Sequence, residues 1–153
     1  SGTSGVCDLP RLEVYASARV SPNLLVLLGD QHANPDDVYA YYDVAETVLE
    51  YGVRQGSKTF ASCAVFRSRR AEDRVYVAAT TSEEASSLAE RLGGKPFSFG
   101  RIVSQMGPLL GLARVRGFRI ICVLGLLKGG PEDGAMASIL FDRLTKALEL
   151  TII

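Results

Sequence analysis

Mainly apolar runs that alternate with helix-like segments constrain the fold of this chain more than any other feature. Such runs occur at residues 24–28 (LLVLL), 59–66 (TFASCAVF) and 119–124 (RIICVL). A run without alternation of apolar and polar residues is typical of a strand that is buried on both faces of a sheet. Residues 12–16 and 75–79 predict two further strands, the first of which alternates and is therefore half-buried.

Amphipathic segments follow most of these runs. Residues 34–37 (NPDD) have the polar cap, proline and carboxylates of a helix start. Ser82 predicts the N-cap of a second helix that ends at Gly93. Further helices are expected at 107–116 and 135–148, and a short strand at 97–99. The order β, β, α, β, β, α, (β), α, β, α predicts a three-layer α/β fold with helices on both faces of a largely parallel or mixed sheet.

The chain is expected to form one domain. Residues 1–10 begin with Ser-Gly-Thr-Ser-Gly, which is typical of a flexible N-terminal segment or a tag remnant. The remaining residues, 11–153, contain neither an internal repeat nor a dividing linker. We therefore expect a single α/β domain at 11–153.

Charge and composition exclude several classes of function. Lys+Arg and Asp+Glu are both 17, and this zero balance argues against a nucleic-acid partner bound through bulk charge. One histidine and three cysteines without a CxxC pattern lead us to expect no metal and no cofactor. Cys63 and Cys122 lie within apolar runs, so we expect both to be small core residues. The apolar runs are too short to span a membrane, and the cysteine usage indicates a reducing cytoplasm.

Two segments are candidates for a ligand site. Asp30 follows an aliphatic strand, where ligands bind in open α/β sheets, and with His32 it would form an acid–base pair. The loop 125–134 (GLLKGGPEDG) contains Lys128, Gly129 and Gly130 and precedes a helix, so its amides are candidates for phosphate binding. For both segments a role in a loop or helix cap is the favoured interpretation, and neither a P-loop nor a GxGxxG motif is present.

Two other clusters suggest contacts with macromolecules. Arg67, Arg69, Arg70 and Arg74 form a basic segment, but Glu72 and Asp73 dilute its charge, and a solvated hairpin tip is the favoured interpretation. Tyrosines gather on the first helix, and they indicate either a protein contact or ordinary helix packing: Tyr39, Tyr41, Tyr42 and Tyr51.

Three segments follow one another along the chain. The first is LVLLGD at 25–30 followed by the Tyr/Ala/Leu helix at 41–50, and the second is VYVAAT at 75–80 leading into 82–84. The third is GPLLGLA at 107–113 with Gly117, ICVLG at 121–125 and the helix at 135–148. Together they span about residues 12–150, and in this order they resemble the proteasome assembly chaperone family, in its archaeal and bacterial branch, a family also labelled an ATP-grasp superfamily.

This resemblance implies a phosphorylase-like α/β fold without established catalytic residues. It also implies self-association into a homo-oligomer and binding to proteasome subunits. The chain departs from the family pattern in three places. It ends in Leu-Thr-Ile-Ile without a penultimate tyrosine, its loop at 126–130 reads LLKGG, and no strand–helix module with a Gly-rich turn precedes residue 12.

The leading hypothesis is therefore a non-enzymatic interaction protein that acts through its surfaces. The alternative is a nucleoside- or phosphate-binding enzyme that uses Asp30, His32 and the loop 125–134. A third hypothesis, RNA contact through residues 67–74, predicts binding that depends strongly on salt.

Overall fold

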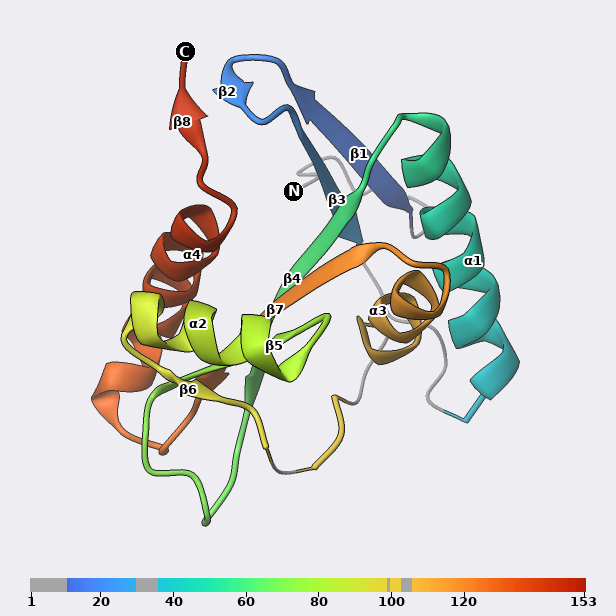
Figure 1. The fold of residues 1–153 in the computed structure, drawn as a ribbon. Helices are drawn as coiled ribbons and strands as arrows, with labels where there is room; N and C mark the ends of the chain where they lie inside the picture. Colours follow the sequence, from blue (N-terminus) through green and yellow to red (C-terminus); the bar gives the residue numbers. More distant parts are fainter. Residues whose placement is uncertain (1–10, 30–35, 99, 103–105) are drawn as a thin grey trace, which may run out of the picture.

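A computed structural model describes residues 11–29, 36–98, 100–102 and 106–153. Figure 1 shows how the elements of the chain are arranged. In chain order they are β1 (Leu12–Ser17), β2 (Val20–Ser21), β3 (Leu24–Gly29), α1 (Val38–Arg54), β4 (Thr59–Phe66), β5 (Val75–Ala79), α2 (Ser82–Leu92), β6 (Lys95–Pro96), α3 (Met106–Val115), β7 (Arg119–Leu126), the 3-10 helix η1 (Pro131–Ala135), α4 (Met136–Ala147) and β8 (Thr151–Ile152).

The main sheet has β7 at its centre. The strand order among the described residues is β4-β7-β5-β6. β4 pairs with β7 in parallel, from Thr59 opposite Arg119 to Phe66 opposite Leu126, whereas β5 pairs with β7 antiparallel. Because β7 has a neighbour on each side and helices on each face, its residues from Ile120 to Leu126 are all buried.

Helices cover both faces of this sheet (Figure 1). On one face, α1 and α3 pack against the side chains of Ile120, Cys122 and Leu124. On the other face, α2 and α4 pack against Ile121 and Val123, which alternate with the first set along β7. The predicted three-layer α/β fold with a mixed sheet is therefore confirmed.

A glycine allows α4 to lie close to β7. A Cβ atom on Gly125 would lie 2.4 Å from Met136 Sδ and 2.7 Å from Met136 Cγ. Met136 is only 1% exposed, so its side chain occupies the space that any larger residue at 125 would need.

The cap of α2 lies one residue earlier than predicted. Thr81 has extended backbone angles, and its side-chain oxygen accepts a hydrogen bond from the Glu84 amide at 3.2 Å. Ser82 is already the first residue of the helix. The predicted end at Gly93 is confirmed, because Gly93 adopts the left-handed conformation with φ 67°.

Two expectations about the strands are wrong. β3 is not a strand buried in a parallel sheet: it pairs antiparallel with β1, and Val26 and Leu28 are exposed. The connection between β4 and β5 is not a hairpin, because β7 lies between these two strands. The chain also forms a strand pair that the sequence did not predict, between β2 and β8.

Candidate functional site

The carboxyl ends of β4 and β7 bring together two loops that are far apart in the sequence. β4 leads into residues 67–74 and β7 into residues 127–130, and the two strands are parallel neighbours. Lys128 Nζ donates a hydrogen bond to the Glu72 carbonyl at 3.1 Å, and Arg74 lies 3.9 Å from the Asp133 carboxylate. The basic segment and the glycine-rich loop, which are separate motifs in the sequence, therefore form one site.

Asp133 organises the glycine-rich loop. Its carboxylate accepts hydrogen bonds from the amides of Lys128 at 3.1 Å and Gly129 at 2.7 Å, while Gly129 adopts φ 82°. Desolvation raises the pKa of Asp133, but these amides together with Arg74 and Arg67 outweigh it and hold the pKa below its ordinary value. Asp133 is not among the candidate residues of the sequence; the available signal is its position in a Gly/Pro-rich loop, because aspartate side chains often accept hydrogen bonds from nearby backbone amides in turns.

The hydrogen bonds to Asp133 use backbone amides of the predicted phosphate site. The two amide groups that were expected to meet a phosphate donate instead to Asp133. A phosphate at the same amides would have to replace that carboxylate. Phosphate binding by Lys128, Gly129 and Gly130 therefore stays a prediction.

Asp30 and His32 lie outside the described residues. The prediction that a parallel strand precedes Asp30 is nevertheless wrong, because that strand, β3, belongs to an antiparallel hairpin.

An aromatic cluster supports the base of the same loops. Tyr76, Phe66 and Phe97 make mutual edge-to-face contacts with centroid separations of 5.6 to 6.4 Å. The Tyr76 hydroxyl accepts hydrogen bonds from the amides of Glu72 at 3.0 Å and Asp73 at 3.2 Å. Since Tyr76 is only 4% exposed, its ring shapes the loop from beneath and is not accessible for stacking on a base.

The two described cysteines differ in environment. Cys122 is buried, accepts a hydrogen bond from the Ser62 hydroxyl at 3.3 Å, and burial raises the pKa of its thiol to about 11. Cys63 is exposed on β4, so the expectation that it is a core residue is wrong. The reason is that β4 lies at the edge of the sheet, which an apolar sequence run alone does not reveal.

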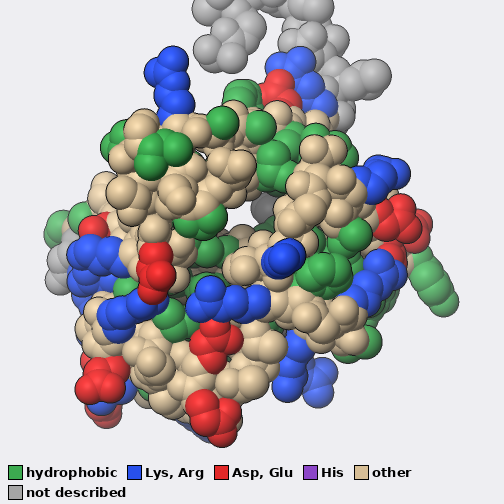
Figure 2. Space-filling model, turned by 45° about the horizontal axis from the view of Figure 1, so that its top comes forward, with side chains coloured by type: hydrophobic (Ala, Val, Ile, Leu, Met, Phe, Trp, Pro, Cys, Tyr) green, Lys and Arg blue, Asp and Glu red, His purple; other side chains and the backbone are tan. Residues whose placement is uncertain are grey.

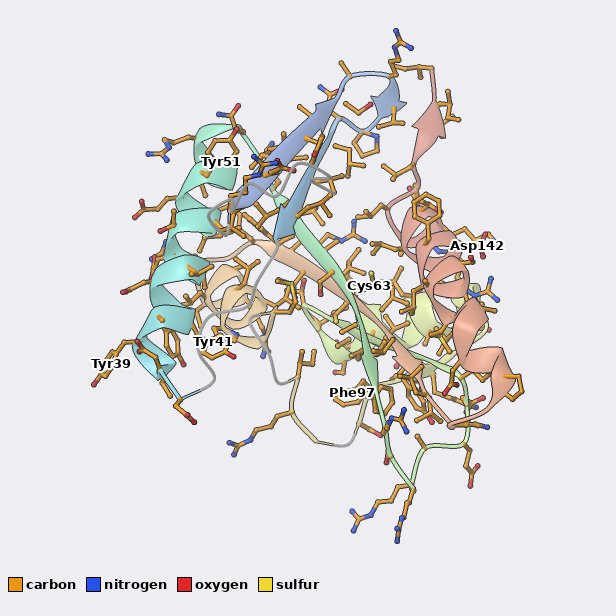
Figure 3. All side chains as sticks on the ribbon, turned by 180° about the vertical axis from the view of Figure 1, so that it is seen from behind. Tyr39, Tyr41, Tyr51, Cys63, Phe97 and Asp142 are labelled. Carbon is orange, nitrogen blue, oxygen red and sulfur yellow. The ribbon has the colours of Figure 1, made fainter. Side chains whose placement is uncertain are left out.

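Large apolar side chains are exposed on two elements, α1 and the β1–β3 hairpin. On α1, Tyr39 is 84% exposed and Tyr42 47%, and Figure 3 shows Tyr39 pointing away from the body of the molecule. The β1–β3 hairpin exposes Leu12, Val14, Tyr15, Val26 and Leu28. Within the described residues, neither hydrophobic core cluster includes a hairpin side chain.

Both faces of the hairpin contribute to this exposure. The pairing places Val14 beside Leu27 on one face and Tyr15 beside Val26 on the other. An isolated two-stranded ribbon is at best marginally stable in water, so a hairpin with apolar side chains on both faces is suited to pack against a further surface. Figure 2 shows hydrophobic side chains mixed with charged ones around a hollow in the face of the molecule that it presents.

The fold and these surfaces define a class of protein: a three-layer α/β domain whose exposed features are apolar surfaces and two interlocked polar loops. A comparison with protein-family models identifies the family within this class. The PAC2 family model matches residues 2–153, and the chain belongs to that family. The predicted resemblance is thereby confirmed, while the ATP-grasp label attached to it receives no support.

Solved structures agree with this assignment at the level of the fold. Pyrococcus furiosus PbaB, an archaeal proteasome activator, is 24% identical with a TM-score of 0.81, over 100% of this chain and 68% of that one. Pyrococcus furiosus PbaA, an archaeal homolog of proteasome-assembly chaperone, is 23% identical with a TM-score of 0.73, over 95% of this chain and 62% of that one. A proteasome-assembly chaperone homologue from Mycobacterium tuberculosis is 12% identical with a TM-score of 0.64, over 94% of this chain and 61% of that one.

Among curated proteins, none matches this chain by sequence. Among the described residues, no helix combines the length and apolar character that a membrane crossing requires.

Proposed function

We propose that this chain is a chaperone-like interaction domain that associates with itself and binds proteasome subunits. The proposal is supported by membership of the PAC2 family and by the similarity to PbaB, an archaeal proteasome activator, and PbaA, an archaeal homolog of proteasome-assembly chaperone. We expect the domain to act in the cytoplasm and through its surfaces rather than through catalysis.

The observation that carries the proposal is the exposure of large apolar side chains on α1 and, separately, on the hairpin. Tyr39, Tyr42 and Leu28 are 84%, 47% and 54% exposed. Tyrosine suits a protein contact because its ring buries apolar area while its hydroxyl still reaches a polar partner. A subunit that is waiting to assemble exposes apolar surface of its own, which such residues are able to cover.

Copurification with 20S proteasome subunits tests the binding step. We expect the wild-type chain to retain α or β subunits, and the double variant Tyr39→Ser/Tyr42→Ser to retain at least about tenfold less, because two aromatic contacts are lost. Val115→Ser is the matched control, since Val115 is 86% exposed on α3 and lies outside the proposed surface. Equal retention by the double variant and the wild type would contradict the proposed surface, and no retention by the wild type would contradict the proposed partner.

The phosphate-binding alternative makes a different prediction. Millimolar nucleotide or nucleoside would raise the melting temperature of the wild-type chain, and Lys128→Ala would abolish that shift. An unchanged melting temperature would count against this alternative.

A further inference from the structure

The two edges of the main sheet differ in how they are protected. The edge at β6 is two residues long and consists of Lys95 and Pro96. A short strand, a lysine and a proline are the devices by which natural sheets prevent further pairing. The edge at β4 is eight residues long (TFASCAVF) and has neither a charge nor a proline. On its outer side, β4 has no paired strand among the described residues.

The outward backbone groups of β4 form a regular row. The carbonyls of Lys58 and Phe66 accept hydrogen bonds from Arg119 and Leu127, so the even-numbered residues direct their backbone groups toward β7. The direction of the backbone N–H and C=O groups alternates from residue to residue along a strand. The odd-numbered residues of β4 therefore direct these groups outward, away from β7: Thr59, Ala61, Cys63 and Val65. These four residues offer a template for another strand.

The side chains along this edge are also suited to pairing. Ala61, Cys63 and Val65 lie on the face of the sheet that α4 covers, and Val65 remains 51% exposed. Phe141 of α4, a helix that contacts β4, is 71% exposed. In Figure 3, β4 runs across the front of the view with Cys63 on the side toward α4. Within the described part of the chain no strand pairs with this apolar, uncharged edge, so it is suited to accept one from outside.

We propose that β4 pairs antiparallel with β4 of a second copy of this chain, so that two sheets join across a two-fold axis. A two-fold axis perpendicular to the sheet keeps α4 of both copies on the same side and makes the interface isologous. Opposed residues then point to the same face, and the outward groups of odd-numbered residues pair with one another.

The sequence of β4 is complementary to itself in this arrangement. With Cys63 on the axis, Val65 of one copy lies opposite Ala61 of the other, and Phe60 lies opposite Phe66. A large side chain therefore meets a small one on the α4 face, and two aromatic side chains meet on the other face. Between Thr59 and Phe66 no charges oppose each other, and the zero net charge of the chain adds no overall repulsion between copies.

This inference rests on the self-association in the proposed function and assigns it to one strand. The proximity of the two Cys63 thiols makes it testable by cross-linking. In a Cys7→Ser background, a short bismaleimide at pH 8 is expected to convert most of the assembled protein to a covalent dimer. Cys122 will not compete, because it is buried and its thiol has a pKa of about 11. Partial burial also raises the pKa of the Cys63 thiol, so the reaction requires a longer incubation than a free thiol does.

Matched variants distinguish this interface from random collision. Moving the thiol, as in Cys7→Ser/Cys63→Ser/Val115→Cys, should leave only background cross-linking, since Val115 is exposed on α3. Val65→Lys should raise the dimer dissociation constant measured by light scattering by about tenfold or more, because the charge enters the interface twice. Val115→Lys is the control and should leave that constant unchanged.

The outcomes separate this inference from the proposed function. An oligomer that forms equally well with Val65→Lys and does not cross-link through Cys63 would overturn the β4 interface while leaving self-association intact. A chain that stays monomeric at all concentrations would overturn both self-association and this interface. Hydrogen exchange gives a further check, since the amides of Ala61, Cys63 and Val65 should become protected as concentration rises. Protection of these amides in the monomer would show that another segment covers the edge, and would also overturn the inference.

Discussion

Replacing Gly125 with alanine tests how closely α4 packs on the sheet. The added Cβ atom would lie 2.4 Å from Met136 Sδ, 2.7 Å from Met136 Cγ and 3.3 Å from Leu140 Cδ1. Ordinary contacts between such atoms are about 3.5–4.0 Å, so the methionine must move by about 1 Å or more. Met136 and Leu140 are 1% and 4% exposed, so this movement takes place within a packed core.

Two opposing effects determine how much Gly125→Ala changes the free energy of unfolding. Overpacking of a core typically costs about 1–3 kcal/mol. Removing a glycine from a strand recovers about 0.5–1 kcal/mol of backbone entropy. The flexible methionine absorbs part of the strain, so we expect Gly125→Ala to lower the free energy of unfolding by about 1–2 kcal/mol. At this chain length that corresponds to a fall in melting temperature of about 2–8 °C.

Urea denaturation with a double-mutant cycle tests this reasoning. Met136→Ala alone should cost about 2–5 kcal/mol. The double variant should cost less than the sum of the two single changes by at least about 0.5 kcal/mol, because the new methyl group enters the space that Met136 leaves. Gly111→Ala is the control: Gly111 is in α3 with no atom within 4 Å of its added Cβ, and we expect a gain of about 0.5–1 kcal/mol. A neutral Gly125→Ala variant, or strictly additive costs in the cycle, would refute the close approach as the cause.

Two further predictions concern the cap of α2 and the loop at Asp133. In urea denaturation, Thr81→Ala should lower the free energy of unfolding by about 1 kcal/mol, whereas Ser82→Ala should have little effect. A larger loss for Ser82→Ala than for Thr81→Ala would contradict Thr81 as the cap. The pKa of Asp133 is lowered in the folded protein, so its contribution to stability is present above the ordinary aspartate pKa of about 4 and is lost as pH falls below it. The unfolding free energy of Asp133→Asn should therefore fall less steeply than that of the wild type between pH 4 and pH 3, and identical slopes would contradict this role.

Much of the fold could be predicted because local pattern and tertiary environment agree. β7 is an aliphatic run with helices on both faces, and the structure buries it completely after its first residue. The helix at 82–92 has an apolar stripe of Ala85, Leu88, Ala89 and Leu92, and these residues are the ones that are buried.

The sheet order could not be predicted, and the site depends on it. Sequence neighbours often pair in sheets, which favoured a hairpin between β4 and β5. The insertion of β7 between them instead makes β4 and β7 parallel, and this is why the loops after Phe66 and Leu126 meet. The contact between Lys128 and Glu72, 56 positions apart, follows from strand order and has no local signal.

The failed prediction for β3 also carries information about function. Its run of five aliphatic residues indicates a buried strand, yet the structure places it in a hairpin whose side chains belong to neither core cluster of the described residues. Such a conflict between local pattern and environment is costly, because exposed leucine and valine side chains favour aggregation without stabilising the monomer. A partner that covers the hairpin would remove the conflict by giving the run the burial that its composition requires. The same residues that misled the fold prediction are therefore an argument, independent of the structural relatives, that this domain works by contact with another protein surface.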